Sequence, residues 1–433
     1  MSSPSLKNAW LIAIILFLFQ SLHNADIYVI SVVFPQVLDE FQITYVYGGA
    51  LITATTVLSV VLFPVWGYLF DRYSRRLLIS VAGVIWGFTT WLNTLPRSFL
   101  GFFVTRILTG IDNTPPSGIE SLISDYFPPK KRGKPLGLIG ATGATGALIR
   151  TIVGVVIGYA YGWRYLFLIT GGLGILMAVI VYLAVKDVPR GSSEPELSGL
   201  KIREELYKIR FRDIFVLVKK PSMLFLSLQG FFGVFPWMTL QTWVFTYMLR
   251  ERMFSETMAL FAMLIWLITM VFGNFAGGAI GDALFSRTVR GRAIVGAVVV
   301  FLSALTIYIT LSWPVEDVAG FTVLGTVTSF ILPMAGPNVV ASIMDTVQPE
   351  VRSSAASLLS IFESAGSSTA PLIAGYLADL YGLGFGMMYI STSTWIVCGV
   401  LFTVLAVVIP RDISELRRMM RERADQLKGG DTI

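Results

Sequence analysis

The feature that most limits how this chain can fold is a series of long apolar runs that recur along its whole length. A helix needs about 20 mostly apolar residues to cross the roughly 30 Å hydrocarbon core of a bilayer. Twelve runs reach that length, at approximately 8–34, 45–70, 77–95, 99–127, 135–161, 165–185, 223–249, 258–281, 293–311, 318–344, 353–377 and 385–409. The predicted fold class is therefore an all-α membrane protein with twelve transmembrane helices.

The composition agrees with a chain that uses lipid as its solvent. Of the 433 residues, 55% are hydrophobic and only 14% are charged, whereas soluble proteins carry about 25% charged residues. The net charge is +6, but the basic residues occur in short clusters between apolar runs and form no continuous face. We therefore expect the lipid bilayer as a partner and no nucleic acid.

Two scarce residue types exclude most soluble enzyme chemistry. The chain has one cysteine, Cys398, and one histidine, His23, and both lie inside apolar runs. An intramolecular disulfide needs two cysteines, and the usual zinc sites need several Cys or His ligands. We expect no enzyme activity, no cofactor and no metal.

A polar stretch separates two halves of six runs each. It contains Pro189, Gly191 and Pro195 and then becomes basic. The predicted domains are an N-terminal six-helix bundle at 1–188, a cytoplasmic linker at 189–221, a C-terminal six-helix bundle at 222–410 and a cytoplasmic tail at 411–433. The basic part of the linker fits either an amphipathic helix on the membrane surface or a solvated connector.

The distribution of Lys and Arg predicts the orientation in the membrane. With the N-terminus inside, only Arg97, Arg164, Arg250 and Arg252 fall in outer segments, while nearly all the other basic residues fall in inner ones. The positive-inside rule then places both termini in the cytoplasm. Short loops and the absence of a targeting signal favour a cell (inner) membrane.

The two halves share landmarks at matching positions, which is typical of transporters built from repeated bundles. Gly67 stands four residues before Asp71 after the second run, and the same spacing recurs at Gly278 and Asp282 after the eighth. An aspartate also stands seven residues before an arginine after the fourth run (Asp125, Arg132) and after the tenth (Asp345, Arg352). The repeat predicts two pseudo-symmetric six-helix bundles.

These inner helix ends are candidates for gating elements. Opposite charges there can pair across neighbouring helices and break when the bundles move, although the same residues could serve only to keep the loops inside. The predicted gating residues are Gly67, Asp71, Arg72, Arg75, Arg76, Asp125, Arg132, Asp282, Asp345 and Arg352.

Several motifs resemble a known family. The segment from Gly67 to Arg76, Gly-Tyr-Leu-Phe-Asp-Arg-Tyr-Ser-Arg-Arg, resembles the signature loop of the major facilitator superfamily. Further segments resemble its Spinster-like branch, namely Asn24-Ala-Asp26, Arg106-Ile-Leu-Thr-Gly110, Ile123-Ser-Asp-Tyr-Phe-Pro128, Gly162-Trp-Arg164 and Pro189-Arg-Gly191. The resemblance covers mainly 22–191. It implies the major facilitator fold. The Spinster-like branch and its neighbours, the organic anion:cation symporters, move lysolipids, sphingoid phosphates or small organic anions, so the resemblance implies a substrate of this kind.

The sequence departs from that branch at two positions. Spinster-like proteins usually carry an arginine after the aspartate of the first span, where this chain has Ile27. They also carry a glutamate seven residues after the arginine of the fourth span, where this chain has Asn113 beside Asp112.

Three charged residues are expected near mid-membrane, where ionisable groups cost several kcal/mol and mark functional sites. Counting about 1.5 Å per residue from the outer helix ends puts Asp26, Arg106 and Arg150 at roughly the same depth. The family arrangement brings the first, fourth and fifth spans together, so Asp26 and Arg106 are expected to pair. In one hypothesis Arg106 binds an anionic substrate when Asp26 is protonated; in the other the two form a static ion pair.

Other polar residues complete the predicted site. His23 lies one turn before Asp26 and could relay protons or merely satisfy a carbonyl, and Glu363 is the mid-membrane carboxylate of the second half. Pro115 and Pro116 should kink the fourth span beside Asp112. The predicted substrate-binding residues are Arg106, Arg150, Asp112 and Asn113, and the predicted proton-coupling residues are Asp26, His23 and Glu363. Arg150 could join Arg106 or pair with Asp26 or Asp112.

The sequence thus favours a monomeric, proton-coupled secondary transporter that moves an organic anion or a lysolipid-like amphiphile by alternating access. No Gly-x-x-x-x-Gly-Lys-Ser/Thr pattern occurs, which argues against direct ATP drive. Two alternatives stay open: a proton-driven multidrug exporter, and a non-transporting receptor or scaffold on the same fold.

Overall fold

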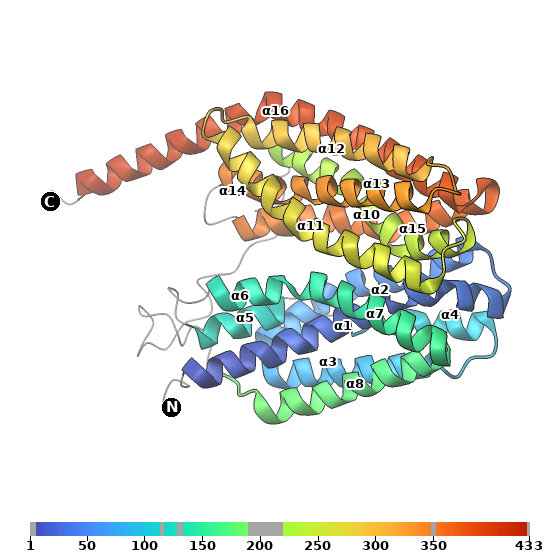
Figure 1. The fold of residues 1–433 in the computed structure, drawn as a ribbon. Helices are drawn as coiled ribbons and strands as arrows, with labels where there is room; N and C mark the ends of the chain where they lie inside the picture. The colour runs from blue at the N-terminus through green and yellow to red at the C-terminus, as the bar shows by residue number, and fades with distance from the viewer. Residues whose placement is uncertain (1–5, 113–116, 128–132, 189–219, 348–351, 431–433) are drawn as a thin grey trace. The chain divides into compact units, whose positions relative to one another are not determined.

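The computed structural model describes residues 6–112, 117–127, 133–188, 220–347 and 352–430, and within them it is helical with no strand (Figure 1). The helices of the first half are α1 (Leu6–Phe41), α2 (Tyr45–Arg72), α3 (Arg75–Leu92), α4 (Phe99–Leu108), α5 (Ser117–Tyr126), α6 (Gly133–Gly140), α7 (Thr142–Tyr161) and α8 (Trp163–Ala184). Those of the second half are α10 (Pro221–Arg250), α11 (Glu256–Phe285), α12 (Gly291–Leu311), α13 (Val318–Ile331), the 3-10 helix η4 (Leu332–Met334), α14 (Ala335–Thr346), α15 (Arg352–Tyr381) and α16 (Leu383–Gly430).

Each predicted apolar run falls on one helix or on two or three consecutive helices. Among the described residues, nine helical segments are long and apolar enough to cross a membrane: Asn8–Phe41, Tyr45–Phe70, Lys134–Tyr161, Trp163–Ala184, Pro221–Arg250, Glu256–Phe285, Gly291–Ser312, Val318–Thr346 and Leu383–Met419. The all-helical prediction is confirmed. The full set of twelve spans in two bundles stays a prediction, since the runs at 77–95, 99–127 and 353–377 lie outside these nine segments.

The chain divides into two compact units. Unit 1 comprises 1–206 and 245–264, and unit 2 comprises 207–244 and 265–433. The domain boundaries predicted from the sequence, at 188, 222 and 410, stay a prediction. The predicted tail falls on the last part of α16, which continues as a helix through Pro410.

Glycines set the close packing of the helices that carry the candidate site in unit 1. α3 runs along α8 and α1 runs along α7. A Cβ added at Gly87 of α3 would lie 2.6 Å from the carbonyl oxygen of Gly171 of α8, and one added at Gly146 of α7 would lie 2.9 Å from that of Ser21 of α1. Larger residues would push these backbones apart, so small residues fix the spacing of the four helices.

In each unit, the second helix packs against an interrupted one. In unit 2, η4 breaks the helix between α13 and α14, and a Cβ at Gly277 of α11 would lie 2.3 Å from Met334 of η4. In unit 1, Ser59 of α2 donates a hydrogen bond at 3.1 Å to the Gly110 carbonyl, in the break between α4 and α5. The internal repeat found in the sequence thus has a counterpart in the packing.

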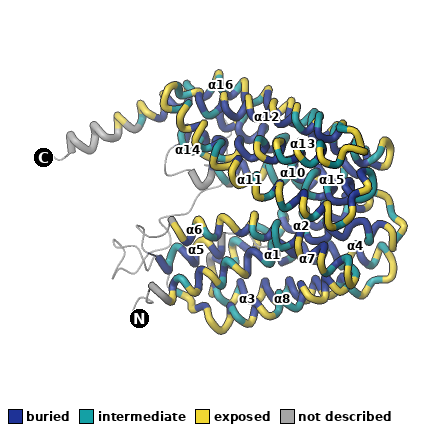
Figure 2. The backbone as a smooth tube through the Cα atoms, in the orientation of Figure 1, coloured by how far each residue is buried: buried dark blue, intermediate teal, exposed yellow. Residues whose placement is uncertain are grey.

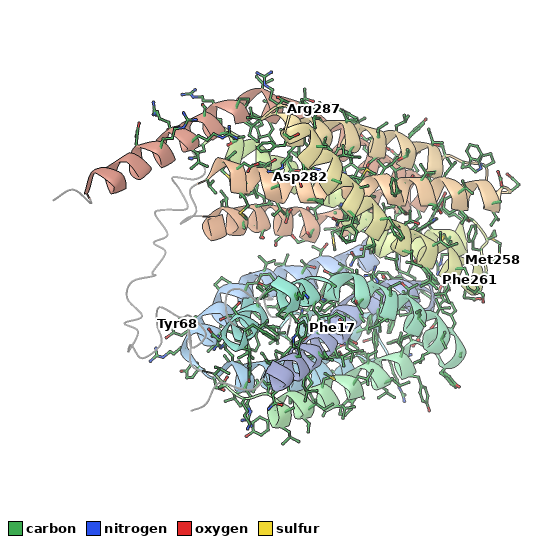
Figure 3. All side chains as sticks on the ribbon, turned by 60° about the vertical axis from the view of Figure 1, so that its left-hand side comes forward. Phe17, Tyr68, Met258, Phe261, Asp282 and Arg287 are labelled. Atoms are coloured by element: carbon green, nitrogen blue, oxygen red, sulfur yellow. The ribbon has the colours of Figure 1, made fainter. Side chains whose placement is uncertain are left out.

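Large apolar side chains lie on the outer faces of the helices, which is where a membrane protein meets lipid. Exposed positions run along the helices of both units (Figure 2). Phe261 and Met258 at the start of α11 are 60% and 45% exposed, and Tyr68 of α2 is 56% exposed (Figure 3). Together with the long apolar helices, this surface identifies a multi-pass membrane protein.

Candidate functional site

Five of the predicted site residues are buried together in unit 1. His23 and Asp26 come from α1, Arg106 from α4, Asp112 from the segment after α4, and Arg150 from α7. Each is at most 6% exposed. Because burying an ionised side chain is costly unless it has partners, the contacts of each one indicate which charges are balanced.

Arg106 and Asp26 lie near each other without forming the expected ion pair. Asp26 interacts electrostatically with the guanidinium of Arg106, but no ion pair joins them within 4.0 Å among the described residues. Nη2 of Arg106 donates instead to the carbonyl oxygen of Ile27 at 2.5 Å. Thr90 Oγ1 of α3 donates to Asp26 Oδ2 at 2.8 Å. The direct ion pair expected between Asp26 and Arg106 is therefore absent among the described residues, where one nitrogen of Arg106 bonds to α1 and one oxygen of Asp26 bonds to α3.

Arg106 and Asp26 each keep polar atoms that bond to no described residue. Nε and Nη1 of Arg106, and Oδ1 of Asp26, are buried without a hydrogen-bond partner among the residues described. The guanidinium lies 5.8 Å from the centre of the Phe167 ring of α8. Arg106 therefore keeps two nitrogens, Nε and Nη1, whose N–H groups bond to no described residue.

Arg150 is a second buried guanidinium, and no carboxylate of the described residues pairs with it. It lies 5.6 Å from the centre of the Tyr28 ring, and its Nε has no hydrogen-bond partner within the described part of the chain. Neither Asp26 nor Asp112 forms an ion pair with it there. Arg150 therefore does not pair with Asp26 or Asp112, which was one of the expectations for it. Because Ile27 and Tyr28 are consecutive, Arg106 and Arg150 flank the same turn of α1.

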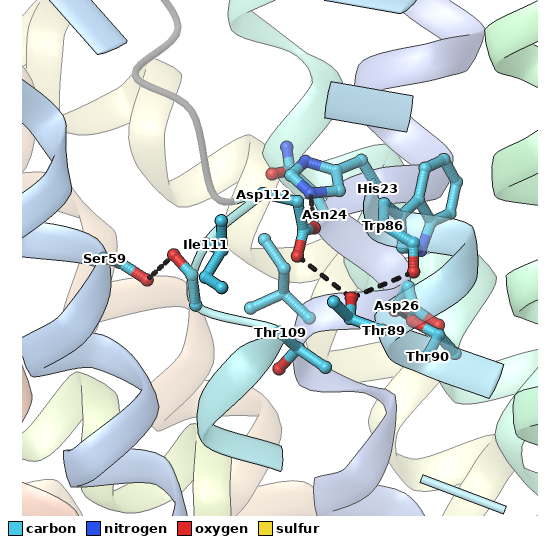
Figure 4. Close-up of polar contacts among 12 residues, drawn as sticks. His23, Asn24, Asp26, Ser59, Trp86, Thr89, Thr90, Thr109, Ile111 and Asp112 are labelled. Carbon is cyan, nitrogen blue, oxygen red and sulfur yellow. Dashed lines mark hydrogen bonds and ion pairs between the residues drawn. The ribbon is translucent and has the colours of Figure 1, made fainter. Parts of the chain in front are cut away.

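His23 pairs with Asp112 and not with Asp26 (Figure 4). Nε2 of His23 lies 2.7 Å from Oδ2 of Asp112, and Thr89 Oγ1 of α3 lies 3.4 Å from Oδ1. The His23 ring packs 5.3 Å from Trp86 of α3. Although His23 lies one turn before Asp26, its imidazole points toward the fourth span.

The break in the fourth span positions Asp112. α4 ends at Leu108, seven residues before Pro115, so the helix stops earlier than the prolines predicted. The carbonyls freed by the break bond to α2: Ser59 donates to Gly110, and Trp66 Nε1 donates to Ile111 at 2.7 Å. These two hydrogen bonds hold the segment after α4 against α2.

Two predicted residues lie apart from this group. Asn113 falls outside the described residues. Glu363 lies in α15 of unit 2 and is half-buried. Its side chain packs close to Gly230 of α10, because a Cβ built on that glycine would lie 3.2 Å from Cγ of Glu363. No ion pair of Glu363 occurs within the described residues. The proton-coupling role of Glu363 stays a prediction.

Arg75 joins the helix ends of the first half that the sequence predicts to be cytoplasmic. Its Nη1 lies 2.5 Å from Asp125 Oδ2 and 2.8 Å from Ser121 Oγ, and its Nη2 donates to the carbonyl of Val188 at 2.9 Å. One guanidinium therefore connects α3, α5 and the segment after α8. Asp187 adds a further contact, because its carboxylate accepts from the backbone N–H of Arg76 at 3.0 Å.

In the second half, Arg292 joins helix ends in the same way as Arg75 does in the first half. Arg292 was not among the residues predicted from the sequence. Arg292 of α12 lies 2.8 Å from Asp282 of α11 and also pairs with Asp345 of α14. Arg75 and Arg292 both stand at the start of the third helix of their half and both bind the aspartate at the end of the fourth span. The repeat itself would have identified Arg292.

The other predicted gating residues give weaker support. Arg72 donates to the hydroxyl of Tyr68 at 2.5 Å, and the guanidinium of Arg76 lies 4.4 Å from the Tyr182 ring centre. A Cβ built at Gly67 would meet no described atom of another helix within 4 Å, so no close helix approach within unit 1 depends on this glycine. Arg132 and the side chains of Asp71 and Arg352 lie outside the described part. The gating roles stay predictions.

Comparisons with known proteins agree with this architecture. The family model of the Major Facilitator Superfamily matches residues 16–335. The chain is 24% identical to the hexuronate transporter of Bacillus subtilis over 87% of this chain and 90% of that protein. It is 27% identical to protein spinster homolog 1 of Xenopus laevis over 87% of this chain and 74% of that protein.

A solved structure supports the same fold. The crystal structure of a bacterial homolog to the human lysosomal transporter Spinster, in its inward-facing and unoccupied conformation, superposes with a TM-score of 0.83. The superposition covers 94% of this chain and 99% of the bacterial homolog. The two sequences are only 19% identical, so the likeness concerns the fold. Since the family model covers well over half of the sequence, this chain belongs to the Major Facilitator Superfamily and is a transporter, not an enzyme.

Proposed function

We propose that this transporter is proton-coupled and carries an organic anion, whose negatively charged group binds between Arg106 and Arg150. The observation that carries the proposal is that two buried guanidinium groups, Arg106 of α4 and Arg150 of α7, both contact one turn of α1, at Ile27 and Tyr28, and neither is in an ion pair within the described residues. A charge buried in a membrane helix without a partner costs several kcal/mol. Such a cost is understandable if a substrate anion supplies the missing partner.

A sugar acid is the substrate class that we favour. The relative from Bacillus subtilis is called a hexuronate transporter, and a hexuronate is a sugar that carries one carboxylate. Arginine binds carboxylates well, because its planar N–H groups can donate two parallel hydrogen bonds. A lysolipid-like amphiphile with an anionic head has the same charge requirement and is the second class to test.

Asp26 supplies the coupling to protons in this proposal. Its carboxylate acts on Arg106 through its charge and keeps one oxygen without a described partner. Once protonated, Asp26 no longer offsets the charge of Arg106, and the substrate anion binds more tightly. By linkage, the bound anion then favours the proton on Asp26 to the same degree. Anion and proton would therefore be carried together.

Transport by purified protein in liposomes tests the proposal. With an imposed pH gradient, we expect accumulation of labelled glucuronate and none of glucose, which lacks the carboxylate. Arg106→Gln should abolish the accumulation, while the matched variant Arg97→Gln, which removes an exposed arginine nine residues earlier, should leave it intact. Equal transport of glucose and anions, or full activity of Arg106→Gln, would contradict the proposal. Accumulation of a lysophosphatidate but not glucuronate would move the substrate class to the amphiphile.

A further inference from the structure

A cavity at the end of unit 2 lies apart from every residue assigned above. Its volume is about 480 Å³, and it is lined by the C-terminal part of α16 and by the turn between α11 and α12. Arg417, Arg418 and Arg421 form its polar side together with Ser414. Val289, Pro410 and Ile413 form its apolar side. The cavity therefore combines concentrated positive charge with an apolar wall.

Its position in the chain puts the cavity where helices leave the apolar layer. Val289 lies in the short turn that joins the candidate spans Glu256–Phe285 and Gly291–Ser312. The last apolar run ends near Ile409, immediately before the residues of α16 that line the cavity. A site at such helix ends lies at the depth of lipid headgroups.

The charges around the cavity strongly favour an anionic occupant. The three arginines of α16 are exposed, and the turn that contains Val289 adds exposed Arg287 (Figure 3) and Arg290. Among the described residues of this part of α16, Arg418 has a weak contact with Glu422 at 3.8 Å. Asp412 is buried and accepts the backbone N–H of Ser222 at 3.0 Å, so it caps α10 and does not neutralise the arginines.

We propose that this cavity binds the phosphate headgroup of an anionic membrane phospholipid. Guanidinium groups bind phosphate oxygens through charge-assisted, often bidentate hydrogen bonds. Clusters of basic residues immediately beyond a transmembrane helix are the usual binding feature for anionic lipids. Val289, Pro410 and Ile413 provide contact for the glycerol and the first acyl carbons, which a free phosphate ion would not use. The proposal is independent of the transported substrate.

Native mass spectrometry of the full-length protein in detergent tests the site. We expect retained phosphatidylglycerol and little phosphatidylcholine. The double variant Arg417→Gln/Arg421→Gln should weaken phosphatidylglycerol binding on the order of tenfold, given two lost arginines near the headgroup. The control Arg97→Gln/Arg411→Gln removes the same charge from exposed positions outside the cavity and should bind as wild type does. Arg417→Lys/Arg421→Lys should retain most of the binding.

Several results would overturn the proposal. One is equal loss of lipid in the cavity variant and the control, which would mean that only net charge matters. Another is equal retention of phosphatidylcholine and phosphatidylglycerol. A third is glycerol phosphate binding as tightly as the lipid, which would identify a site for soluble phosphates. Gel filtration and circular dichroism on each variant establish that the protein is folded, so a loss of binding reports on the site.

Discussion

Replacing Arg150 by methionine should stabilise the substrate-free protein while destroying its function. Arg150 is 6% exposed, forms no ion pair within the described residues, and has Tyr28 as its one ring contact there. Most buried charges behave in the opposite way, because they have partners that the substitution would strand. The sign of the stability change therefore reports on whether Arg150 is balanced inside the protein.

The size of the effect follows from the contacts. An arginine at the centre of a membrane helix costs about 2.5 to 3.5 kcal/mol on insertion scales. The cation–π contact with Tyr28 offsets roughly 1 to 2 kcal/mol of this cost. Methionine has similar length and no charge, so Arg150→Met should raise the free energy of unfolding by about 1 to 2 kcal/mol.

Arg164 provides the matched control with the opposite expectation. Its guanidinium lies 2.6 Å from both carboxylate oxygens of Glu40 and donates to the carbonyls of Thr94 and Pro96. Arg164→Met should lower the free energy of unfolding by about 1 kcal/mol, a modest value because the pair is partly exposed. Equilibrium unfolding in mixed micelles measures both variants, and transport in liposomes should be lost in Arg150→Met. A stability loss in Arg150→Met as large as that in Arg164→Met would refute the reasoning.

Three further predictions concern other contacts. His23→Gln and Asp112→Asn, measured singly and together by unfolding, should show a coupling energy of about 0.5 to 3 kcal/mol, because the two side chains share a buried hydrogen bond. Additive effects would mean that the bond is not formed. Gly87→Ala should lower the free energy of unfolding by about 1 to 3 kcal/mol, since its new methyl group would lie 2.6 Å from a carbonyl oxygen. Gly67→Ala should raise the free energy of unfolding by about 0.5 to 1 kcal/mol, because its methyl group meets no other helix and alanine favours the helix. Arg292→Gln should change the transport rate more than Arg292→Lys does, because both joined carboxylates lose a cation; identical rates would exclude a gating role.

The sequence was most informative where physical rules act along one helix. The lengths of the apolar runs predicted where the long helices lie, because the thickness of the hydrocarbon core fixes how many apolar residues a spanning helix needs. The burial of Asp26, Arg106 and Arg150 in one unit was also foreseeable, since their distances from the outer helix ends agree. Neither conclusion depends on which helix lies beside which.

The sequence was least informative about which side chains meet. His23 bonds to Asp112, which is 89 positions away, and a helical period relates residues within one helix only. Asp26 and Arg106 were expected in direct contact, but Thr90 and the Ile27 carbonyl take their place, and backbone acceptors carry no sequence signal. The fourth span breaks at Leu108, ahead of its prolines, because α2 supplies donors for the freed carbonyls.

Arg292 is absent from the predicted gating residues, although it lies at the start of the third helix of its half, as Arg75 does. Aligning the two halves by their third helices would have placed it opposite Arg75, and its two aspartates were already predicted. The repeat thus contained the information, but the loop before Arg292 is longer than the one before Arg75.

The most direct test of the central claim is proton movement during transport. A pH-sensitive dye inside liposomes should report a proton flux when glucuronate is added to the wild-type protein. Asp26→Asn should still bind the anion and exchange it across the membrane, but should move no protons with it. Proton flux in Asp26→Asn equal to that of the wild type would contradict the proposed coupling between Asp26 and Arg106.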